Sequence, residues 1–274
     1  MKDHFLECGG DSLGMMRLAA RVYQELSVDI SIKEIFDHLE LDSLCQLIQQ
    51  KPQSPFARIR PQPFQNEYPA SPAQHRIWIL DQMDTTHTVY HISGGYEIKG
   101  LLDVDALTKA FQLLIQRHES LRTGFFYKDG QLKQVISQKT SFKINPIPLN
   151  GPEKTLKAII VKSKALLQKA FDLSRPPLLK AYLFEIGPKH SVLVINIHHI
   201  ISDGWSLQIF INELSICYQA LTANQHPQLP EIHIQYKDYT LWQQQLLESN
   251  YGQKLKKFWH QELSGELSRI DFPT

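Results

Sequence analysis

SVLVINIHHIISDGWS, residues 191–206, contains a short apolar run that leads into two adjacent histidines. The run is mostly β-branched and too short to span a membrane, which is typical of a strand buried on both faces. His198 and His199 follow where this strand gives way to a loop. Because successive side chains on a strand point to opposite faces, we expect one imidazole in a pocket and the other packed or hydrogen-bonded behind it.

Asp203 and Gly204 follow His199 beyond the expected end of the strand. We interpret one of the two histidines as a candidate base, Asp203 as a carboxylate that orients it or braces the loop, and Gly204 as a residue that allows a positive φ or a close approach. The histidine pair alone leaves a second interpretation open, because neutral histidines at strand ends are commonly hydrogen-bonded core residues. No metal site is predicted, because adjacent strand residues diverge and no further His/Cys pair lies at ligand spacing.

HHIISDGWS resembles the His-His-x-x-x-Asp-Gly signature of condensation domains of nonribosomal peptide synthetases, which are related to the chloramphenicol-acetyltransferase-like acyltransferases. Three further stretches resemble motifs of the same family in the same order: SPAQHRIWIL at 71–80, RHESLRTGF at 117–125 and YKDYTLW at 236–242. Four ordered matches are far more specific than one.

The resemblance implies an activity and a set of catalytic residues. The α-amine of a carrier-bound acceptor would attack the carbonyl of a carrier-bound donor thioester and form an amide. His199 would remove a proton from the amine, position it or stabilise developing charge, with His198 behind it. Asp203 would serve structure, and Gly204 would direct its backbone N–H toward the oxyanion. SPAQHRIWILDQ resembles domains that take an L-configured donor, and HHIISDG lacks the paired aspartates of heterocyclisation domains.

Arg122 and Arg117 in the second motif have two possible roles. Arginines between a helix and a strand are usually solvated or form weak surface pairs. The resemblance implies instead that one of them forms a buried pair with Asp203, because a lone buried carboxylate would be costly. The sequence does not choose between the two, and Arg122 is the preferred candidate.

Composition narrows the class of protein. The 274 residues are 42% hydrophobic and 21% charged, with a net charge of +1, so charge gives no case for nucleic acid or an anionic membrane as a partner. The N-terminus has no signal-peptide core, and no apolar run reaches spanning length. Three scattered cysteines fit a reducing compartment, so we expect a cytoplasmic protein.

Residues 1–50 are predicted to form short helices, the first beginning at Asp11-Ser12. Ser12 is either an N-cap or an exposed hydroxyl at a helix N-terminus, where N–H groups and the helix dipole favour a phosphodiester. FLECGGDSL resembles the motif of peptidyl carrier proteins, whose serine bears 4′-phosphopantetheine, although carriers ahead of condensation domains often have His in place of Asp11. The resemblance implies a partial carrier that lacks its first helix.

Residues 51–66 contain four prolines and no apolar periodicity, and we interpret them as a linker. Residues 67–274 are predicted to interleave helices and strands without strict βαβ order. The expected fold is therefore a mixed α/β sandwich, a chloramphenicol-acetyltransferase-like lobe, preceded by a partial small helical bundle. Because later family motifs have no counterpart, the resemblance implies the N-terminal lobe alone, and we expect it to be inactive in isolation.

The expected partners are aminoacyl and peptidyl carrier proteins, adenylation domains of the same assembly line and a phosphopantetheinyl transferase. Two alternatives stay open. One is a stand-alone acyltransferase that uses coenzyme A, although the proline-rich linker and the segment at Ser12 speak against it. The other is a scaffold that docks carriers without catalysing a reaction.

Overall fold

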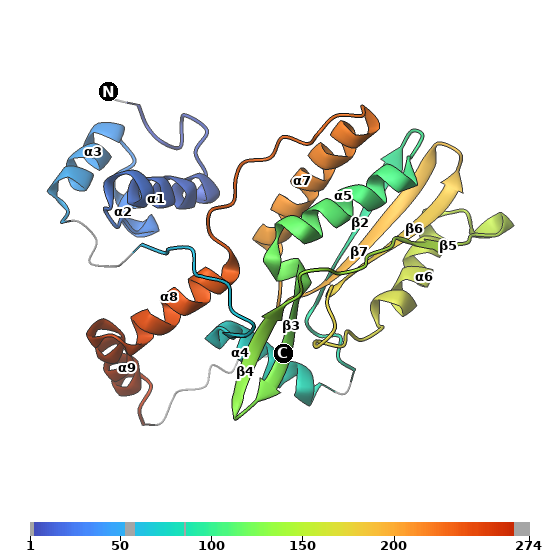
Figure 1. Cartoon of the computed structure of the whole chain (residues 1–274). Helices are drawn as coiled ribbons and strands as arrows, with labels where there is room; N and C mark the ends of the chain where they lie inside the picture. The colour runs from blue at the N-terminus through green and yellow to red at the C-terminus, as the bar shows by residue number, and fades with distance from the viewer. Residues whose placement is uncertain (1–2, 53–57, 85, 266–274) are drawn as a thin grey trace, which may run out of the picture. The chain divides into compact units, whose positions relative to one another are not determined.

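The computed structural model describes residues 3–52, 58–84 and 86–265 (Figure 1). The chain divides into two compact units, one within residues 1–58 and one within 59–274. Each unit has its own hydrophobic core. In the described ranges, no helix combines the length and apolarity that crossing a membrane requires.

The first unit contains three helices: α1 (Ser12–Leu26), α2 (Ile32–Asp37) and α3 (Leu41–Gln50). Ser31 and Glu34 form a reciprocal capping box at the start of α2, which satisfies backbone donors that a short helix would otherwise leave free. The helices bury one small cluster, which consists of Met15, Val22, Val28, Ile30, Ile35 and Leu44. The short helices predicted for residues 1–50 are confirmed.

A four-stranded sheet forms the centre of the second unit, in the order β2-β7-β6-β5. Its strands are β2 (His91–Lys99), β7 (His190–His198), β6 (Leu179–Gly187) and β5 (Asn145–Ile147). The first three pair antiparallel and β5 pairs parallel with β6, so the sheet is mixed as expected.

Strand β7 is buried on both faces, as its unbroken apolar run predicts. Alternate side chains separate into two clusters. Leu193, Ile195 and Ile197 belong to the main core on one face, and Val192 and Val194 belong to a smaller core on the other. The predicted burial of this strand on both faces is confirmed.

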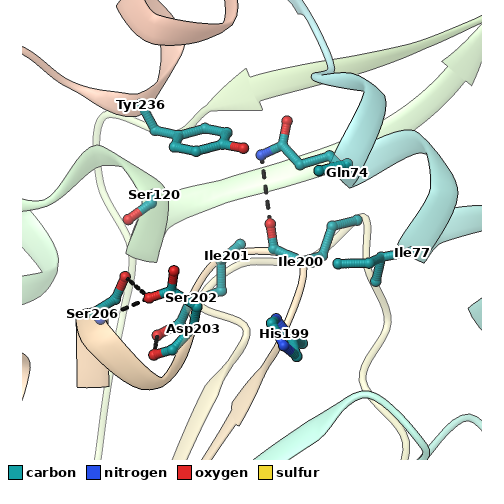
Figure 2. Close-up of a pocket in the computed structure, with 11 residues that line it drawn as sticks. Gln74, Ile77, Ser120, His199, Ile200, Ile201, Ser202, Asp203, Ser206 and Tyr236 are labelled. Atoms are coloured by element: carbon teal, nitrogen blue, oxygen red, sulfur yellow. Dashed lines mark hydrogen bonds between the residues drawn. The ribbon is translucent and has the colours of Figure 1, made fainter. Parts of the chain in front are cut away.

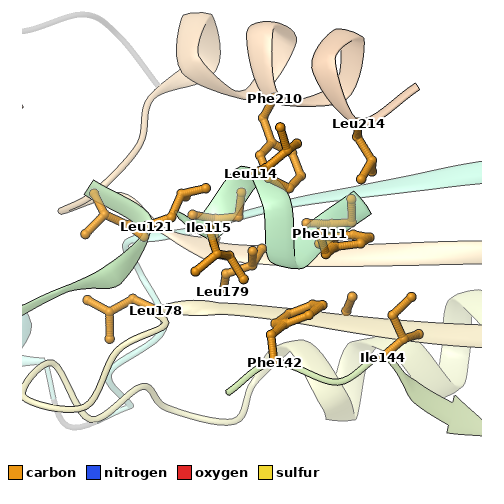
Figure 3. Close-up of a cluster of buried hydrophobic side chains, with 14 of the residues drawn as sticks. Phe111, Leu114, Ile115, Leu121, Phe142, Ile144, Leu178, Leu179, Phe210 and Leu214 are labelled. Carbon is orange, nitrogen blue, oxygen red and sulfur yellow. The ribbon is translucent and has the colours of Figure 1, made fainter. Parts of the chain in front are cut away.

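Helices cover the two faces unequally. Helices α5 (Val104–Arg117) and α7 (Gly204–Thr222) contribute to the main core, and α6 (Leu156–Leu167) contributes Ile159 to the smaller one. Figure 3 shows Phe210 and Leu214 of α7 directed toward α5. This packing fixes the start of α7 near the end of β7.

A second sheet, β1-β4-β3, is antiparallel and consists of β1 (Tyr68–Pro69), β4 (Gln131–Ile136) and β3 (Thr123–Lys128). The remaining elements are α4 (Pro72–Met83), α8 (Tyr236–Glu248), α9 (Asn250–Glu262), and the 3-10 turns η1 (Glu119–Arg122) and η2 (Gly151–Glu153). Asp129 and Gly130, both with positive φ, make the tight turn between β3 and β4.

Helix α4 begins after Ser71, whose side chain caps it. Its apolar residues Ile79 and Leu80 are 40% and 38% exposed, whereas the polar residues Gln74 and Asp81 are buried. The inner face of this helix is therefore mixed. Ile77 and Trp78 pack against the main core, and the two polar residues contact the backbone and imidazole at the end of β7.

Candidate active site

The four sequence motifs meet at one cavity of about 210 Å³. Gln74 comes from the first motif, Ser120 from the second and Tyr236 from the fourth, while the third supplies His199 and Asp203. Figure 2 shows these side chains around the turn that follows β7. Segments separated by more than a hundred residues thus line a single space.

The two histidines point to different surroundings, as strand geometry predicts. His198, the last residue of β7, is fully buried and lies behind the cavity. His199 is exposed and lines the cavity, and its backbone N–H donates to the Tyr90 carbonyl at 2.8 Å. Only His199 is therefore available to a substrate.

Asp203 caps helix α7. Its Oδ1 accepts hydrogen bonds from the backbone N–H of Ser206 at 2.7 Å and from the Ser206 hydroxyl at 2.6 Å. Burial alone would raise the pKa of this carboxyl. The hydrogen bonds from Ser206 and the electrostatic effect of His199 outweigh burial and hold the pKa below its ordinary value. Asp203 is thus a charged capping residue at neutral pH.

Gly204 is the first residue of α7, and the expected positive φ is wrong. A Cβ at this position would meet no described atom within 4 Å, so close packing does not require glycine either. The helix begins at Gly204 because the Asp203 side chain supplies the cap. The Gly204 N–H lies at the N-terminus of α7, next to the cavity-lining Asp203.

The expected pairing of an arginine with Asp203 is wrong for the residues that the structure describes. Arg122 donates to the Ser137 carbonyl at 2.8 Å and lies 3.7 Å from Glu119. Asp203 is exposed and hydrogen-bonded to Ser206, so the premise of a lone buried carboxylate fails.

Arg117 instead ties α5 to α7. Its guanidinium contacts both carboxylate oxygens of Glu213 at 3.2 and 3.3 Å, and it also donates to the Pro230 carbonyl. His118 approaches the same carboxylate at 2.6 Å. Arg117, the less favoured candidate for pairing with Asp203, therefore stabilises the packing of α5 against α7.

Sequence reasoning missed two contacts that shape the cavity. The hydroxyls of Tyr236 and Ser71 lie 3.0 Å apart, which joins the first and fourth motifs. Gln74 Nε2 donates to the Ile200 carbonyl at 3.5 Å, as the dashed line in Figure 2 shows. Burial raises the pKa of the Tyr236 phenol, so this group stays protonated at neutral pH. Contacts between such distant segments leave no local signal in the sequence.

Ser12, in the first unit, is exposed and is the first residue of α1. Asp11, rather than Ser12, caps the helix, since its Oδ1 accepts from the Gly14 N–H at 2.6 Å. The alternative in which Ser12 is merely the cap is therefore wrong. Gly10 approaches Phe5 so closely that a Cβ would lie 2.6 Å from the Phe5 carbonyl oxygen. Any larger residue at position 10 would clash with Phe5, so this close approach requires Gly10.

Comparisons with known proteins follow the same division of the chain. Residues 64–274 match the condensation domain family, and residues 2–48 match the phosphopantetheine attachment site. Surfactin synthase subunit 1 of Bacillus subtilis is 36% identical over 99% of this chain, and the match covers 7% of that protein.

Solved structures share the fold. The X-domain bound to OxyB from teicoplanin biosynthesis superposes with a TM-score of 0.72 at 26% identity, covering 80% of this chain and 48% of that one. The starter condensation domain of rhizomide synthetase has a TM-score of 0.66 at 21% identity, covering 75% and 52% of the two chains. The chain thus spans about half the length of these solved domains, and the expected chloramphenicol-acetyltransferase-like fold is confirmed.

Proposed function

The chain belongs to the condensation domain family of nonribosomal peptide synthetases, and on that premise we propose that His199 acts in amide bond formation between carrier-bound thioesters. A phosphopantetheine attachment site precedes the condensation domain. The proposed donor is an L-configured aminoacyl or peptidyl thioester, and the acceptor is the amine of the next carrier-bound residue.

One observation carries the proposal: a side chain from each of the four motifs lines the cavity that holds His199. A nucleophilic amine needs a nearby group that accepts or positions its proton, and an exposed imidazole directly after an inner strand of the sheet meets that need. We assign His199 to this step and His198 to its support.

Charge stabilisation is the second requirement of acyl transfer. We propose that the Gly204 N–H, at the N-terminus of α7, faces the oxyanion that develops on the donor carbonyl. Asp203 would hold this end of the helix in place through Ser206. The thiol of the donor arm is the leaving group, and the amine loses one proton as the amide forms.

Ser12 is the proposed attachment residue for 4′-phosphopantetheine. Its exposure at the N-terminus of α1 fits a phosphodiester, because free N–H groups and the helix dipole favour an anion there. The attached group supplies a thiol that carries the substrate as a thioester. Asp11 and Gly10 shape the turn that presents Ser12.

We further propose the domain limits predicted above: a partial carrier at 1–50, a linker at 51–66 and the N-terminal lobe of the condensation domain at 67–274. Carrier domains of the same assembly line are its partners, and we propose adenylation domains and a phosphopantetheinyl transferase as further ones. The three cysteines are free, which supports a cytoplasmic location.

Replacement of His199 tests the catalytic assignment. In a synthetase that contains this chain together with loaded donor and acceptor carriers, we expect His199→Ala to lower the rate of amide formation by roughly 100-fold or more. The fold should be unchanged because the side chain is exposed. His226→Ala, at another exposed histidine, is the matched control and should retain the wild-type rate. Full activity of His199→Ala would refute the assignment.

Mass measurement tests the carrier. We would incubate the chain with coenzyme A and a broad-specificity phosphopantetheinyl transferase and compare intact masses of the wild type and Ser12→Ala. A gain of one phosphopantetheine in the wild type alone supports the proposal. A gain in both proteins would contradict attachment at Ser12. Acyl transfer from an acyl-coenzyme A without any carrier would favour the stand-alone acyltransferase.

A further inference from the structure

Helix α4 places two buried polar side chains on one face. Gln74 is 4% exposed and Asp81 is 3% exposed. Their separation corresponds to about two helical turns, so both point the same way. Burying polar groups is costly unless they find partners, and the partners of this pair lie around the turn that carries His199.

Asp81 has polar contacts on both carboxylate oxygens. Oδ1 lies 3.4 Å from His198 Nε2. Oδ2 lies 3.3 Å from His87 Nδ1 and accepts from Gln82 Nε2, also at 3.3 Å. The carboxylate is thus tied to its own helix, to the segment after it and to the last residue of β7.

His198 transmits this contact to the backbone. Its Nδ1 accepts a hydrogen bond from the Ile200 N–H at 3.2 Å. Burial lowers the pKa of His198 to about 4, so the ring is neutral at physiological pH. A neutral imidazole whose Nδ1 accepts carries its proton on Nε2, the atom that faces Asp81. The two contacts therefore select one tautomer.

Backbone contacts surround His199 on both sides. The His198 N–H donates to the Leu178 carbonyl at 3.0 Å, and the Ile201 N–H donates to the His198 carbonyl at 3.2 Å. Between them, the Ile200 N–H is held by the His198 ring and the Ile200 carbonyl by Gln74. Helix α4 therefore contacts Ile200 in two ways. Gln74 donates directly to the Ile200 carbonyl, and Asp81 contacts the His198 ring that accepts from the Ile200 N–H.

We propose that Asp81 is a positioning residue, which holds His198 in the Nε2–H tautomer so that His198 Nδ1 fixes the Ile200 N–H and with it the turn that carries His199. Any effect of Asp81 on catalysis rests on the function proposed for His199. The local geometry around His198 does not depend on that function, and it can be tested without measuring turnover.

Nitrogen NMR of the full chain, labelled with ¹⁵N in its 12 histidines, reads the tautomer directly. We expect His198, assigned by its absence in His198→Asn, to show one protonated Nε2 and one unprotonated Nδ1 from pH 6 to 8. In Asp81→Leu both tautomers should become populated. Asp81→Asn should keep the wild-type pattern, because its side-chain carbonyl still accepts from Nε2–H.

Amide hydrogen exchange reads the turn in the same samples. In Asp81→Leu the Ile200 amide should exchange roughly tenfold faster relative to the Ile195 amide, which reports the stability of the sheet. Asp81→Asn should stay within about twofold of the wild type. Leu107→Ala, a core change away from α4, is the matched control and should leave the ratio of the two rates unchanged.

A proton on Nδ1 of wild-type His198, or an unchanged exchange ratio in Asp81→Leu, would overturn the inference. If Asp81→Leu does not fold, the tautomer of wild-type His198 still tests the inference, because a proton on Nδ1 would contradict it. Retained amide formation in His199→Ala would refute the proposed function and leave this local result standing, so the two failures are distinguishable.

Discussion

His198 contributes to stability through its charge state. The ring is buried beside Asp81, His91 and Phe171, and a proton added there would lose most of its hydration. Burial lowers the pKa of His198 from 6.5 to about 4, against the opposing attraction of Asp81. The folded state therefore takes up this proton less readily than the unfolded state.

A pH dependence follows from this difference. Below pH 6.5 the unfolded chain binds the proton and the folded chain does not, so the free energy of unfolding falls as pH drops to about 4 and is unaffected above 6.5. The full effect is on the order of 3 kcal/mol. We expect urea unfolding of His198→Asn to show a correspondingly smaller loss over this range. Equal losses in both proteins would contradict the assigned shift.

Alternation along a strand is a local rule, and it predicted that only one of the two histidines faces the cavity. The family resemblance, not the alternation, indicated that this residue is His199. The partners of Asp203 and Arg122 were mispredicted. Asp203 accepts from Ser206 and Arg122 lies near Glu119, and each of these partners is three residues away. For Asp203, the local cap competes with any distant ion pair. Asp81 was missed because an aspartate in an amphipathic helix gives no sign of being buried.

Strand β7 is buried on both of its faces. Strand β2, its neighbour, alternates between more and less exposed residues, whereas β7 is buried along almost its whole length. The apolar side chains of β7 belong to a separate buried cluster on each face. Neither face of this strand tolerates loss of volume.

We expect Ile195→Ala to lower the free energy of unfolding by about 2–5 kcal/mol. Val194→Ala, on the opposite face, should cost about 1–3 kcal/mol because a smaller side chain is lost. Lys99→Ala on β2 is the control and should change stability by less than about 0.5 kcal/mol, since Lys99 is exposed. Denaturant titration measures all three. A negligible cost at Val194 would show that the α6 face is not a packed core.

Elements with a clear local signal were predicted well. Strand β7 follows the apolar run and is buried on both faces, and α1 begins at Ser12. The sequence of helix α4 gives no sign that Gln74 and Asp81 are buried while Ile79 and Leu80 are exposed. Tertiary contacts with the end of β7 decided its orientation, and those contacts join residues more than a hundred positions apart.

Among the residues that the structure describes, the first unit has a hydrophobic cluster of its own, separate from the two cores of the second unit. This cluster contains few large side chains, among which Ile35 is completely buried. A core of this size supplies little stabilisation beyond the entropy lost on folding. A core substitution of a given cost therefore removes a larger share of the stability in the first unit than in the second.

Replacement of Ile35 tests this. We expect Ile35→Ala to cost about 2–5 kcal/mol within residues 3–52 and to speed amide exchange at Val22. Exchange at Ile195, in the second unit, should stay at the wild-type rate. The same variant should accept phosphopantetheine on Ser12 more slowly. Equal acceleration at Val22 and Ile195 would show that the two cores unfold as one cooperative unit.

Helix α4 also matters for the construction of chimeric synthetases by recombination. Gln74 and Asp81 have their partners on the turn around His198 and Ile200, so the residues of α4 and of this turn have to match one another. A crossover between residues 84 and 198 would combine α4 from one parent with the turn from the other. Where the parents differ at the helix or at the turn, both segments would therefore have to be taken from the same parent.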